Sequence, residues 1–458
     1  MHGSKVDMSN AQVTDLYEVT MALAYVREAM TELATFSLFT RKLPPDRGFL
    51  IAAGLESAIS YLEQFEIDDE DVAAFAEAVD RPDEDLDGLR GLRFTGEVWA
   101  VPEGRVILPG EPLLEVTAPL PEAQLVETFL LNQITYQTAV ASKAARCVIA
   151  GRGKPVVDFS LRRTHGVEAG MHAARAGAIV GFAGTSNVAA ARIYGVPAVG
   201  TMAHSFVEVF PQEEDAFRTF ARHTHGPVTL LVDTYNTPTG VEVAAEVLRE
   251  LTDHRAFGVR LDSGDLNALA RSARRTLDAA GMEKAAIIVS GGLDEYGIDS
   301  LVSADAPVDL FAVGTKVGTA ADQPYLDSAY KLVEYAGQPV MKLSAEKITA
   351  PAPKQVFRRP NCRDVLTVRD EECPADAEPL LEQVMSQGRR LAPQSSAAEA
   401  VVVARQRFTA DLAELPSATR LIHGPTALTP ETSDRLARLT EEVRSRIGYP
   451  RAGGSQLR

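Results

Sequence analysis

The sequence predicts an α/β protein whose centre is a complete or nearly complete (β/α) barrel, with a doubly wound open sheet as the alternative. Short apolar, β-branched runs alternate with amphipathic segments of helical periodicity through the middle of the chain. Runs that are apolar throughout are typical of parallel strands buried on both faces. Seven such runs occur, over residues 155–160, 178–184, 198–204, 228–234, 257–262, 285–292 and 309–315.

The polar residues of these units gather where the runs end and the helical segments begin. In barrels and in open α/β sheets alike, binding sites lie at that edge of the sheet. We therefore expect the functional site there in either fold. The segments concerned are DFSLRRTHG, GTSN, GTMAHS, DTYNT, RLDSGD, SGGLDE and VGTKVG.

The chain on either side of these units predicts a second α/β domain built from both termini. On the N-terminal side we expect a helix, a hairpin, an antiparallel β element and a long helix, over residues 12–30, 35–54, 96–117 and 120–151. On the C-terminal side we expect a hairpin, a poorly structured segment and a charged helix, over 330–344, 360–400 and 420–447. The expected boundaries are 1–125 for the N-terminal part of the second domain, 126–345 for the barrel and 346–458 for the C-terminal segment.

Composition is that of an ordinary globular protein, long enough for two or three domains, with 458 residues, 45% hydrophobic and 24% charged. A formal net charge of −17 argues against nucleic acid or an anionic membrane as the main partner. Three cysteines without a CxxC pair predict neither a disulfide framework nor a cysteine zinc site. Without a secretory leader or a long apolar run, the sequence predicts a cytoplasmic protein.

Glycine-rich turns follow two neighbouring late strands. Ser290, Gly291 and Gly292 follow one run, and Gly314 and Thr315 follow the next. Backbone N–H groups in such turns can point at a phosphate, and late barrel strands are a frequent place for phosphate sites. The alternative is a pair of tight turns with ordinary helix caps. Because both turns lie in adjacent units, the sequence favours a phosphate site.

Charged and aromatic side chains end three other strands. Asp233, Arg260 and Asp262 could hold sugar hydroxyls, Mg²⁺ or an anionic group. Phe159 could stack on a flat ring, and Arg162 beside it could bind an anion. The structural alternatives are capping aspartates with a structural arginine, and a surface ion-pair cluster.

His204, in GTMAHS, is one of eight histidines. A single histidine is more often a structural residue than a catalyst, and because His204 has no partner at HxH or HExxH spacing a metal site there gains no support. His223 and His225 form an isolated HTH segment. The position of His204 at a polar strand end predicts a base or a phosphoryl acceptor.

In order along the chain, the motifs resemble those of nicotinate phosphoribosyltransferases. The resemblance runs from about residue 14 to 358, and little beyond 360 matches. It is carried by TDLYEVTMA, DFSLRRTHG, FAGTSNVAAA, GTMAHSF, LVDTYNT, GVRLDSGD, VSGGLDE, VGT and KLSAEKITAPAPKQVFR.

The resemblance implies an incomplete (β/α) barrel with a second α/β domain, and a homodimer with shared active sites. It implies that nicotinate and 5-phosphoribosyl 1-pyrophosphate give nicotinate mononucleotide and pyrophosphate, the first step of NAD salvage from nicotinate. ATP hydrolysis would be coupled to this transfer, with Mg²⁺ as cofactor, through transient phosphorylation of His204.

Residue roles follow from the resemblance as well. Catalytic roles fall to His204, Arg260 and Asp262. Nicotinate would contact Phe159, Ser186, Thr201, Arg260 and, from the neighbouring subunit, Tyr17. The phosphoribosyl pyrophosphate would contact Arg162, Asp233, Asp262, Ser290, Gly291, Gly292, Gly314 and Thr315, with Asp233 and Asp262 as the Mg²⁺ ligands.

Ser186 favours nicotinate over nicotinamide as the substrate. The related nicotinamide enzymes have Asp at this position, and a carboxylate there would repel the acid. Quinolinate is disfavoured because its second carboxylate needs further basic groups. Two other readings remain open. One is a non-catalytic homologue that binds nucleotides or phosphoribosyl ligands, and the other is a sugar-phosphate aldolase with Lys316 as its Schiff-base residue.

Overall fold

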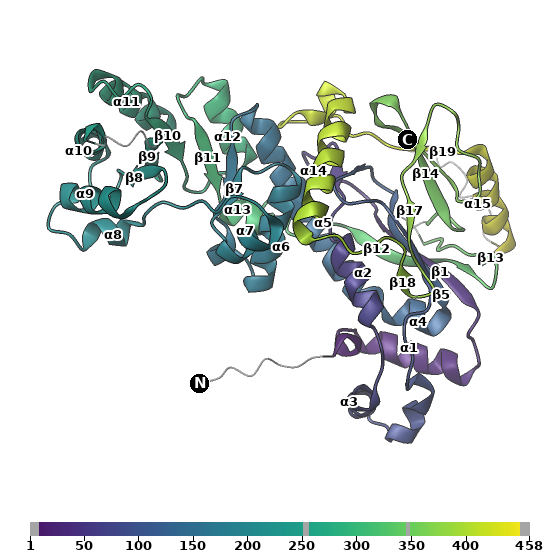
Figure 1. The fold of residues 1–458 in the computed structure, drawn as a ribbon. Coiled ribbons are helices and arrows are strands. Elements are labelled where there is room, and N and C mark those ends of the chain that lie inside the picture. Colours follow the sequence, from purple (N-terminus) through teal and green to yellow (C-terminus); the bar gives the residue numbers. More distant parts are fainter. Residues whose placement is uncertain (1–8, 251–255, 345–348, 449–458) are drawn as a thin grey trace, which may run out of the picture.

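The protein, in a computed structural model, divides into a parallel α/β part and a larger part built on antiparallel sheets (Figure 1). The structure describes residues 9–250, 256–344 and 349–448. Each part has its own hydrophobic core. Helix α5 (Glu127–Gly151) joins them, because the side chains of its first half enter one core and those of its second half enter the other. At 25 residues it is about 37 Å long, enough to span both cores.

The parallel sheet has six strands in the order β7-β6-β11-β10-β9-β8. The first strand along the chain, β6, pairs with the last, β11, so the sheet curls on itself as barrel strands do. Beyond β7 a single parallel bridge joins Thr185 to Ala198. In the described part of the chain no strand pairing connects this segment with β8, and the barrel is therefore incomplete. The strands are β6 (Val156–Asp158), β7 (Gly184–Thr185), β8 (Val228–Leu231), β9 (Phe257–Leu261), β10 (Ala286–Val289) and β11 (Leu310–Val313).

Helices follow most of these strands and cover the outside of the sheet (Figure 1). Side-chain caps begin four of them: Asn187, Asn236, Asp265 and Asp294 each accept a hydrogen bond from a backbone N–H two or three residues into the helix. The helices are α6 (Val167–Ile179), α7 (Val188–Tyr194), α8 (His204–Glu208), α9 (Glu213–His223), α10 (Thr237–Arg249), α11 (Leu266–Ala279), α12 (Glu295–Ser303) and α13 (Thr315–Gly318).

The second part combines strands from both ends of the chain. Its seven-stranded sheet has the order β13-β12-β1-β5-β3-β17-β18, so N-terminal strands lie between C-terminal ones. The strands are β1 (Leu33–Thr40), β3 (Glu97–Ala100), β5 (Pro112–Pro119), β12 (Ser328–Tyr335), β13 (Gln338–Pro339), β17 (Glu382–Ser386) and β18 (Arg389–Arg390). The division at residues 125 and 345 stays a prediction, although β12 and β13 belong to this sheet.

Smaller elements complete the second part. A four-stranded sheet has the order β16-β14-β15-β19, and a two-stranded sheet pairs β2 with β4. Their strands are β2 (Leu50–Ile51), β4 (Val106–Ile107), β14 (Lys354–Arg359), β15 (Arg363–Val368), β16 (Glu378–Pro379) and β19 (Glu431–Thr432). The helices are α1 (Leu16–Arg27), α2 (Leu55–Gln64), α3 (Asp69–Val79), α4 (Leu120–Leu125) and α15 (Asp434–Arg446). Helix α14 (Ala397–Glu414) lies nearby in the chain but packs its buried side chains into the core of the parallel part, against α6 and α7. None of these described helices, nor those of the barrel, has the length and apolarity needed to cross a bilayer.

Two predicted barrel strands were largely wrong. Of residues 178–184, the first two end α6 and only Gly184 lies in a strand, because the buried face of α6 consists of small apolar residues that read as a continuous run. Residues 198–204 form one bridge at Ala198, after which His204 begins α8. The opening of the barrel therefore lies where the sequence predicts its third strand.

The flanking predictions were partly wrong as well. Residues 35–54 do not form a hairpin, because β1 and β2 belong to different sheets. Residues 360–400 contain β15 to β18, whose short strands alternate with turns and leave little periodicity. Only the last part of 420–447 is helical, from Asp434 onward. The antiparallel element over 96–117, the long helix before the barrel and the hairpin over 330–344 were confirmed.

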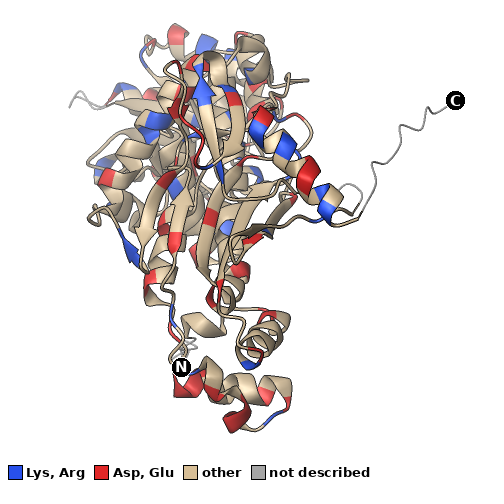
Figure 2. Ribbon diagram, turned by 90° about the vertical axis from the view of Figure 1, so that its right-hand side faces the viewer, with Lys and Arg blue, Asp and Glu red and all other residues tan. Residues whose placement is uncertain are grey.

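Charge is distributed over both parts of the molecule. Acidic and basic residues alternate over most elements in Figure 2, with acidic ones gathered at the lower end of the view. That end holds α3 and the turn after it, whose first turns are wholly acidic.

A buried ion pair between Glu103 and Arg175 holds the two parts together. Glu103 precedes β4, and Arg175 lies in the middle of α6. Glu103 Oε1 accepts hydrogen bonds from Arg175 (2.7 Å) and from the backbone N–H of Gly54 (2.7 Å). Burial would raise the pKa of Glu103, but the guanidinium outweighs it and holds this pKa below its usual value.

We expect Glu103→Gln to lower the free energy of unfolding by about 3 kcal/mol, because it leaves the Arg175 guanidinium buried without a counter-charge. Urea denaturation measures this. Asp85→Asn is the control, since Asp85 pairs with Arg27 and Arg81 at the surface and should cost less than about 1 kcal/mol. Equal effects of the two substitutions would contradict a special role for the buried pair.

Candidate active site

A pocket of about 410 Å³ opens at the carboxyl ends of the barrel strands. Its walls come from the turns after β6, β7 and β9 and from the segment that precedes α8. Seven residues that the sequence marks as candidates line it. The lining residues are Phe159, Arg162, Ser186, Gly200, Thr201, Met202, Ala203, His204, Arg260 and Asp262.

Arg260 lies at the centre of this pocket and spans the opening of the barrel. It belongs to β9, and only 7% of its surface is exposed. Its guanidinium donates to the hydroxyl of Ser290 on one side (2.9 Å) and to the hydroxyl of Thr201 on the other (2.5 Å). It also donates to the Met202 carbonyl (3.2 Å) and to Asp262 Oδ1 (3.1 Å). These bonds use four of the five N–H groups of Arg260 and fix the guanidinium plane, so that an incoming carboxylate meets a cation that is already oriented.

His204 lies beside Asp262 at the edge of the pocket. Its Nδ1 is 3.1 Å from the Thr234 hydroxyl, and its Nε2 is 3.8 Å from Asp262 Oδ2. The side chains of His204 and Asp262 are 40% and 30% exposed, so both are accessible from solvent. A hydroxyl at one nitrogen and a carboxylate near the other orient the imidazole for nucleophilic or base chemistry.

Asp233, at the end of β8, supports the turn that carries Asp262. Its Oδ2 accepts the backbone N–H of Asp262 (3.1 Å) and the hydroxyl of Ser263 (2.6 Å). Its Oδ1 is buried and has no hydrogen-bond partner among the described residues. An unpaired carboxylate oxygen beside Asp262 suits a hard cation such as Mg²⁺. The described residues hold no cluster of three or more side-chain ligands, so such an ion would take its remaining oxygens from substrate and water.

The two glycine-rich turns follow β10, which is the neighbour of the Arg260 strand β9, and β11, which is the next strand beyond β10. Gly291 has φ +89°, and a Cβ there would lie 1.7 Å from the carbonyl oxygen of Asp262. Only glycine fits this close approach between neighbouring strand ends. Gly314 precedes α13, and Lys316 in that helix forms an ion pair with Asp294 (2.9 Å). The partly exposed ion pair is unlike the apolar surroundings that activate a Schiff-base lysine, so the aldolase reading loses support.

Asp158 organises the turns that place Phe159 and Ser186. This buried residue ends β6, and its carboxylate accepts the backbone N–H of Ser160 (2.8 Å) and the hydroxyl of Thr185 (2.7 Å). The backbone N–H of Ser186 donates to the Asp158 carbonyl (2.8 Å). The ring of Phe159 lies 5.8 Å from the guanidinium carbon of Arg260. An aromatic ring and a fixed cation thus border one pocket, as a flat anionic ring would require.

Comparison with known proteins agrees with the motifs. Residues 13–135 match the model of the nicotinate phosphoribosyltransferase N-terminal domain, and residues 155–368 match the model of the nicotinate phosphoribosyltransferase family. A nicotinate phosphoribosyltransferase of Mycobacterium tuberculosis is 50% identical over 388 residues, covering 83% of each chain. The chain belongs to the nicotinate phosphoribosyltransferase family.

Relatives at greater distance share the whole fold. The human nicotinate phosphoribosyltransferase is 33% identical, with 94% of this chain and 96% of the human chain covered. The crystal structure of human nicotinic acid phosphoribosyltransferase superposes with a TM-score of 0.81, covering 94% of this chain and 99% of that one. The predicted fold class, an incomplete barrel with a second α/β domain, is confirmed.

Tyr17 is the one predicted site residue that lies far from the pocket of its own chain. It belongs to α1, at the opposite end of the molecule from α8 (Figure 1). The side chain is 47% exposed, next to the buried Glu18. Partial burial, together with the charges of Glu127 and Glu18, raises the pKa of the Tyr17 hydroxyl. Its predicted role requires a second chain and stays a prediction.

Sequence reasoning missed three residues that complete the site. Thr234 follows Asp233 directly and binds His204, and Ser263 binds Asp233. Both lie in the quoted motifs, where strand-end hydroxyls could have been read as partners. Glu213, at the start of α9, has a buried Oε1 without a hydrogen-bond partner among the described residues. Burial, and next the charge of Asp233, raise its pKa. The run QEED reads as an ordinary acidic helix start, which hides this proximity.

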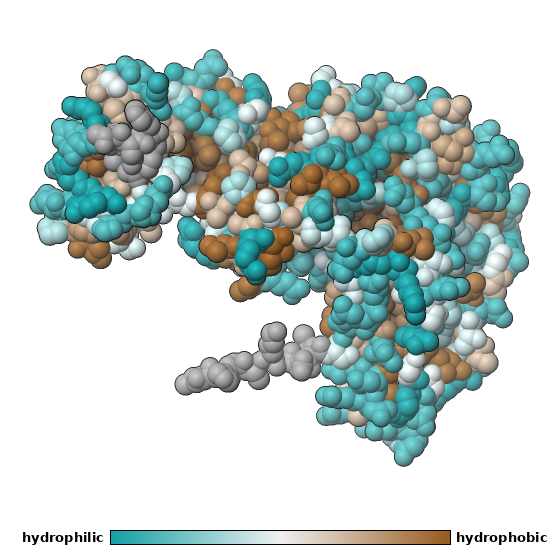
Figure 3. Space-filling view, in the orientation of Figure 1, coloured by the Kyte–Doolittle hydropathy of each residue, from teal (hydrophilic) through white to brown (hydrophobic). Residues whose placement is uncertain are grey.

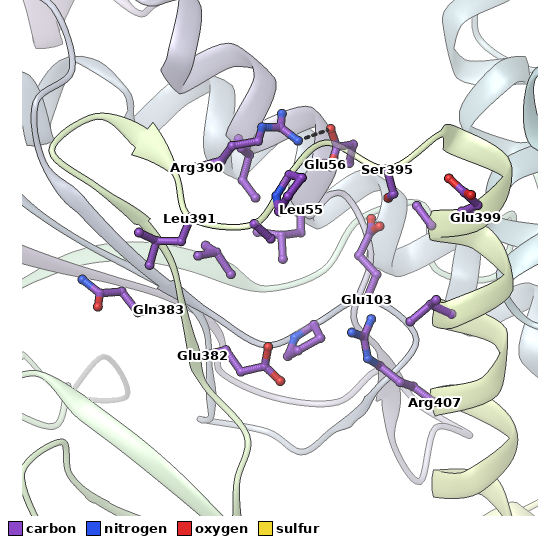
Figure 4. Close-up of a pocket in the computed structure, with 17 residues that line it drawn as sticks. Leu55, Glu56, Glu103, Glu382, Gln383, Arg390, Leu391, Ser395, Glu399 and Arg407 are labelled. Carbon is purple, nitrogen blue, oxygen red and sulfur yellow. Dashed lines mark hydrogen bonds and ion pairs between the residues drawn. The ribbon is translucent and has the colours of Figure 1, made fainter.

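A second cavity of about 310 Å³ lies between α2, the β17–β18 hairpin and α14 (Figure 4). Its wall includes Leu55, Leu391 and the carboxylate of Glu103. Arg390 at its rim pairs with Glu56 (3.0 Å), as the dashed line in Figure 4 shows. No strand-end residue of the barrel lines this cavity, so it does not belong to the candidate active site.

The surroundings of Glu18 predict a pH effect. Burial raises the pKa of Glu18 to about 7, while the hydroxyls of Thr14 and Thr128 oppose this shift. Between about pH 4.5 and 7 the folded protein keeps a proton that the unfolded chain loses, so stability falls as the pH rises. Glu18→Gln cannot titrate and should be more stable than the wild type by about 2 kcal/mol at pH 8, but not at pH 4.

Chemical denaturation at both pH values measures this difference. Glu28→Gln is the control, because Glu28 is exposed at the end of the same helix and should leave the pH profile unchanged. A constant difference between Glu18→Gln and the wild type at the two pH values would contradict a protonated Glu18.

Proposed function

We propose that the protein is a nicotinate phosphoribosyltransferase that forms nicotinate mononucleotide and pyrophosphate from nicotinate and 5-phosphoribosyl 1-pyrophosphate. The bond from the pyridine nitrogen to the anomeric carbon forms as the bond from that carbon to the pyrophosphate oxygen breaks. The observation that supports this most directly is the buried Arg260, held between Ser290 and Thr201 in a pocket that Phe159 borders. Family membership and the names of the relatives agree with it.

The residues that line the pocket support the acid rather than the amide as the pyridine substrate. We propose that Arg260 and the Thr201 hydroxyl bind the nicotinate carboxylate while the ring stacks on Phe159. Ser186 lines the same pocket, and its uncharged hydroxyl does not repel a neighbouring carboxylate. A fixed cation and a stacking ring orient the ring nitrogen toward the sugar, and positioning is the main contribution that such a displacement needs.

The phosphoribosyl pyrophosphate would occupy the polar side of the pocket. We assign its 5-phosphate to the turns at Ser290–Gly292 and Gly314–Thr315, and its sugar and pyrophosphate to Arg162, Asp233 and Asp262. Asp233 and Asp262 would hold Mg²⁺, which when bound neutralises charge on the departing pyrophosphate. The buried, unpaired Oδ1 of Asp233 supports this assignment.

We propose that ATP drives the transfer through His204. One imidazole nitrogen would attack the γ-phosphorus of ATP, forming a nitrogen–phosphorus bond as ADP departs, and water would later release the phosphate. Asp262 and Thr234 hold the ring in place for this step. The partial exposure of His204 leaves room for a nucleotide to approach.

A homodimer would bring Tyr17 to the pocket of its partner. Large apolar side chains are exposed at the same end of the barrel as the pocket, and three of them are about three-quarters exposed: Val167, Val188 and Val209. Hydrophobic surface also lies over α7 and α14 in Figure 3. Apolar patches of this kind mark interfaces, and an incoming α1 carries Leu16 and Tyr17, both about half exposed. A cytoplasmic location stays a prediction.

Product formation from labelled nicotinate tests the proposed activity. With 5-phosphoribosyl 1-pyrophosphate and Mg²⁺ we expect nicotinate mononucleotide, formed faster with ATP, and at least tenfold less product from labelled nicotinamide. Chromatographic separation of the mononucleotide measures both. Binding of the phosphoribosyl donor without any product would support the non-catalytic reading, and a preference for the amide would overturn the assignment of Ser186 and Arg260.

His204→Asn should abolish phosphate incorporation from γ-labelled ATP and the stimulation by ATP, and leave a weak ATP-independent transfer. Asparagine retains one hydrogen-bonding group but cannot form the phosphoramidate. Acid-labile label on the protein is the readout. His223→Asn is the matched control, since this histidine ends α9 outside the pocket lining. Label that persists in His204→Asn would show that another residue accepts the phosphoryl group.

A further inference from the structure

A buried cluster of charged side chains lies directly behind the two glycine-rich turns. Lys143 on α5 is 1% exposed, and its ammonium contacts both Glu295 Oε2 (2.6 Å) and Asp322 Oδ1 (2.8 Å). Arg47 contacts the same two carboxylates, at 3.6 Å and 2.8 Å. Arg146, one turn along α5, donates to Glu295 from its Nε (2.8 Å). Burying so many charges is costly unless each is paired, so the arrangement calls for an explanation.

The two carboxylates of this cluster lie just downstream of the two turns. Glu295 is three residues after Gly292, and Asp322 is seven residues after Thr315, beyond the short helix α13. One ammonium and one guanidinium therefore tie both turns to the same helix and to the loop before β2. A second ion pair, between Asp294 and Lys316, joins the two turns directly (2.9 Å).

The cluster also contains more positive than negative charge. Lys143, Arg47 and Arg146 contribute three cations against the carboxylates of Glu295 and Asp322. Burial would raise the pKa of Asp322, but Arg47 and Lys143 outweigh it and hold this pKa below the usual value, so Asp322 is ionised. A buried net positive charge behind backbone N–H groups would attract an anion in a protein whose formal net charge is −17.

We propose that Lys143 and Arg47 are positioning residues that hold the turns at Ser290–Gly292 and Gly314–Thr315 in register for one phosphate group. This inference rests on the proposed function, because it takes the 5-phosphate of the phosphoribosyl donor as the ligand of both turns. Two turns from separate strands bind one phosphate more tightly when their spacing is fixed before the ligand arrives, because no binding free energy is then lost in ordering them. The shared ammonium and guanidinium supply that constraint from inside the protein.

Asp322→Asn distinguishes positioning of the two turns from simple electrostatic attraction of the phosphate. It removes the carboxylate that ties the second turn to Lys143 and Arg47, and it makes the cluster more positive by one charge. If the cluster only attracted phosphate, the substitution would tighten binding of the donor. If it positions the turns, the Kd of 5-phosphoribosyl 1-pyrophosphate should rise roughly tenfold, while the KM of nicotinate stays within about twofold. Calorimetry on the whole protein measures the Kd without turnover.

Lys143→Met tests the same constraint at its centre, and Lys354→Met is its matched control. Lys354 is another buried lysine, 3.0 Å from Glu115, in the second part of the molecule. Both substitutions should lower the melting temperature, since each leaves a buried carboxylate without its ammonium. Only Lys143→Met should weaken donor binding, and Lys143→Arg, which retains the charge, should recover most of it.

Each outcome decides the proposal. Tighter or unchanged donor binding by Asp322→Asn would overturn it, and so would equal donor binding by Lys143→Met and Lys354→Met. If Lys143→Met does not fold, Asp322→Asn alone remains decisive, because Asp322 is 27% exposed and its substitution disturbs the core less. Failure of the proposed function is recognised separately, since the wild type would then bind no 5-phosphoribosyl 1-pyrophosphate in the same calorimeter.

Discussion

The guanidinium of Arg260 across the opening of the barrel is the interaction on which the candidate site depends. In a closed barrel, strand pairing would fix the ends of neighbouring strands relative to one another. Here the segment before α8 pairs with β7 only at Ala198, and in the described part of the chain no ladder joins it to β8. Arg260 replaces the missing ladder by hydrogen bonds to Thr201 and Met202. The same bonds that hold the barrel mouth together orient the cation toward the pocket.

The incomplete barrel also decides which segment carries His204. A further barrel strand would occupy the place beside β7 from which the segment before α8 carries Thr201 into the pocket. With that strand absent from the described structure, α8 begins at His204 and places the imidazole beside the end of β9. The missing strand pairing between β8 and the segment before α8 therefore affects two groups of the site. It leaves the imidazole of His204 accessible, and it is bridged by the guanidinium of Arg260. The exposed valines around the mouth suit a second chain that would cover what the barrel leaves open.

Ion pairs between residues far apart in the chain link the two parts of the molecule, and they lie close to elements that carry the candidate site. Glu103 meets Arg175 in α6, the helix that begins after the Arg162 turn. Lys143 and Arg47 meet the carboxylates that follow the glycine-rich turns. Buried pairs contribute little net stability compared with apolar packing, but they specify one arrangement because an unpaired charge in the core is costly. We infer that these ion pairs hold the two parts in one relative position. They act close to the carboxyl ends of the barrel strands and therefore restrict the movement of those strand ends.

The sequence alone determined the class of fold, the edge of the sheet that holds the site, and most of the residues that meet there. It could do so because continuous apolar runs, helix caps and polar strand ends are local features, and because parallel strands bring their carboxyl ends to one edge. The resemblance of the motifs to those of nicotinate phosphoribosyltransferases then indicated the reaction. The ion-paired Lys316 and the matched family models agree with that interpretation.

Only the tertiary structure decided where the barrel is open, how Arg260 is held, and which buried charges support the glycine-rich turns. The sequence predicts a strand over residues 198–204 because these residues are largely apolar. Whether they form one depends on hydrogen bonds to a neighbouring strand, which the local sequence does not specify. Thr234, Glu213, Lys143 and Asp322 lie far apart in the chain, on elements whose own patterns predict nothing beyond a helix or a turn. Hydrogen bonds and ion pairs act at about 3 Å, so their partners become known only when the packing of the elements is known.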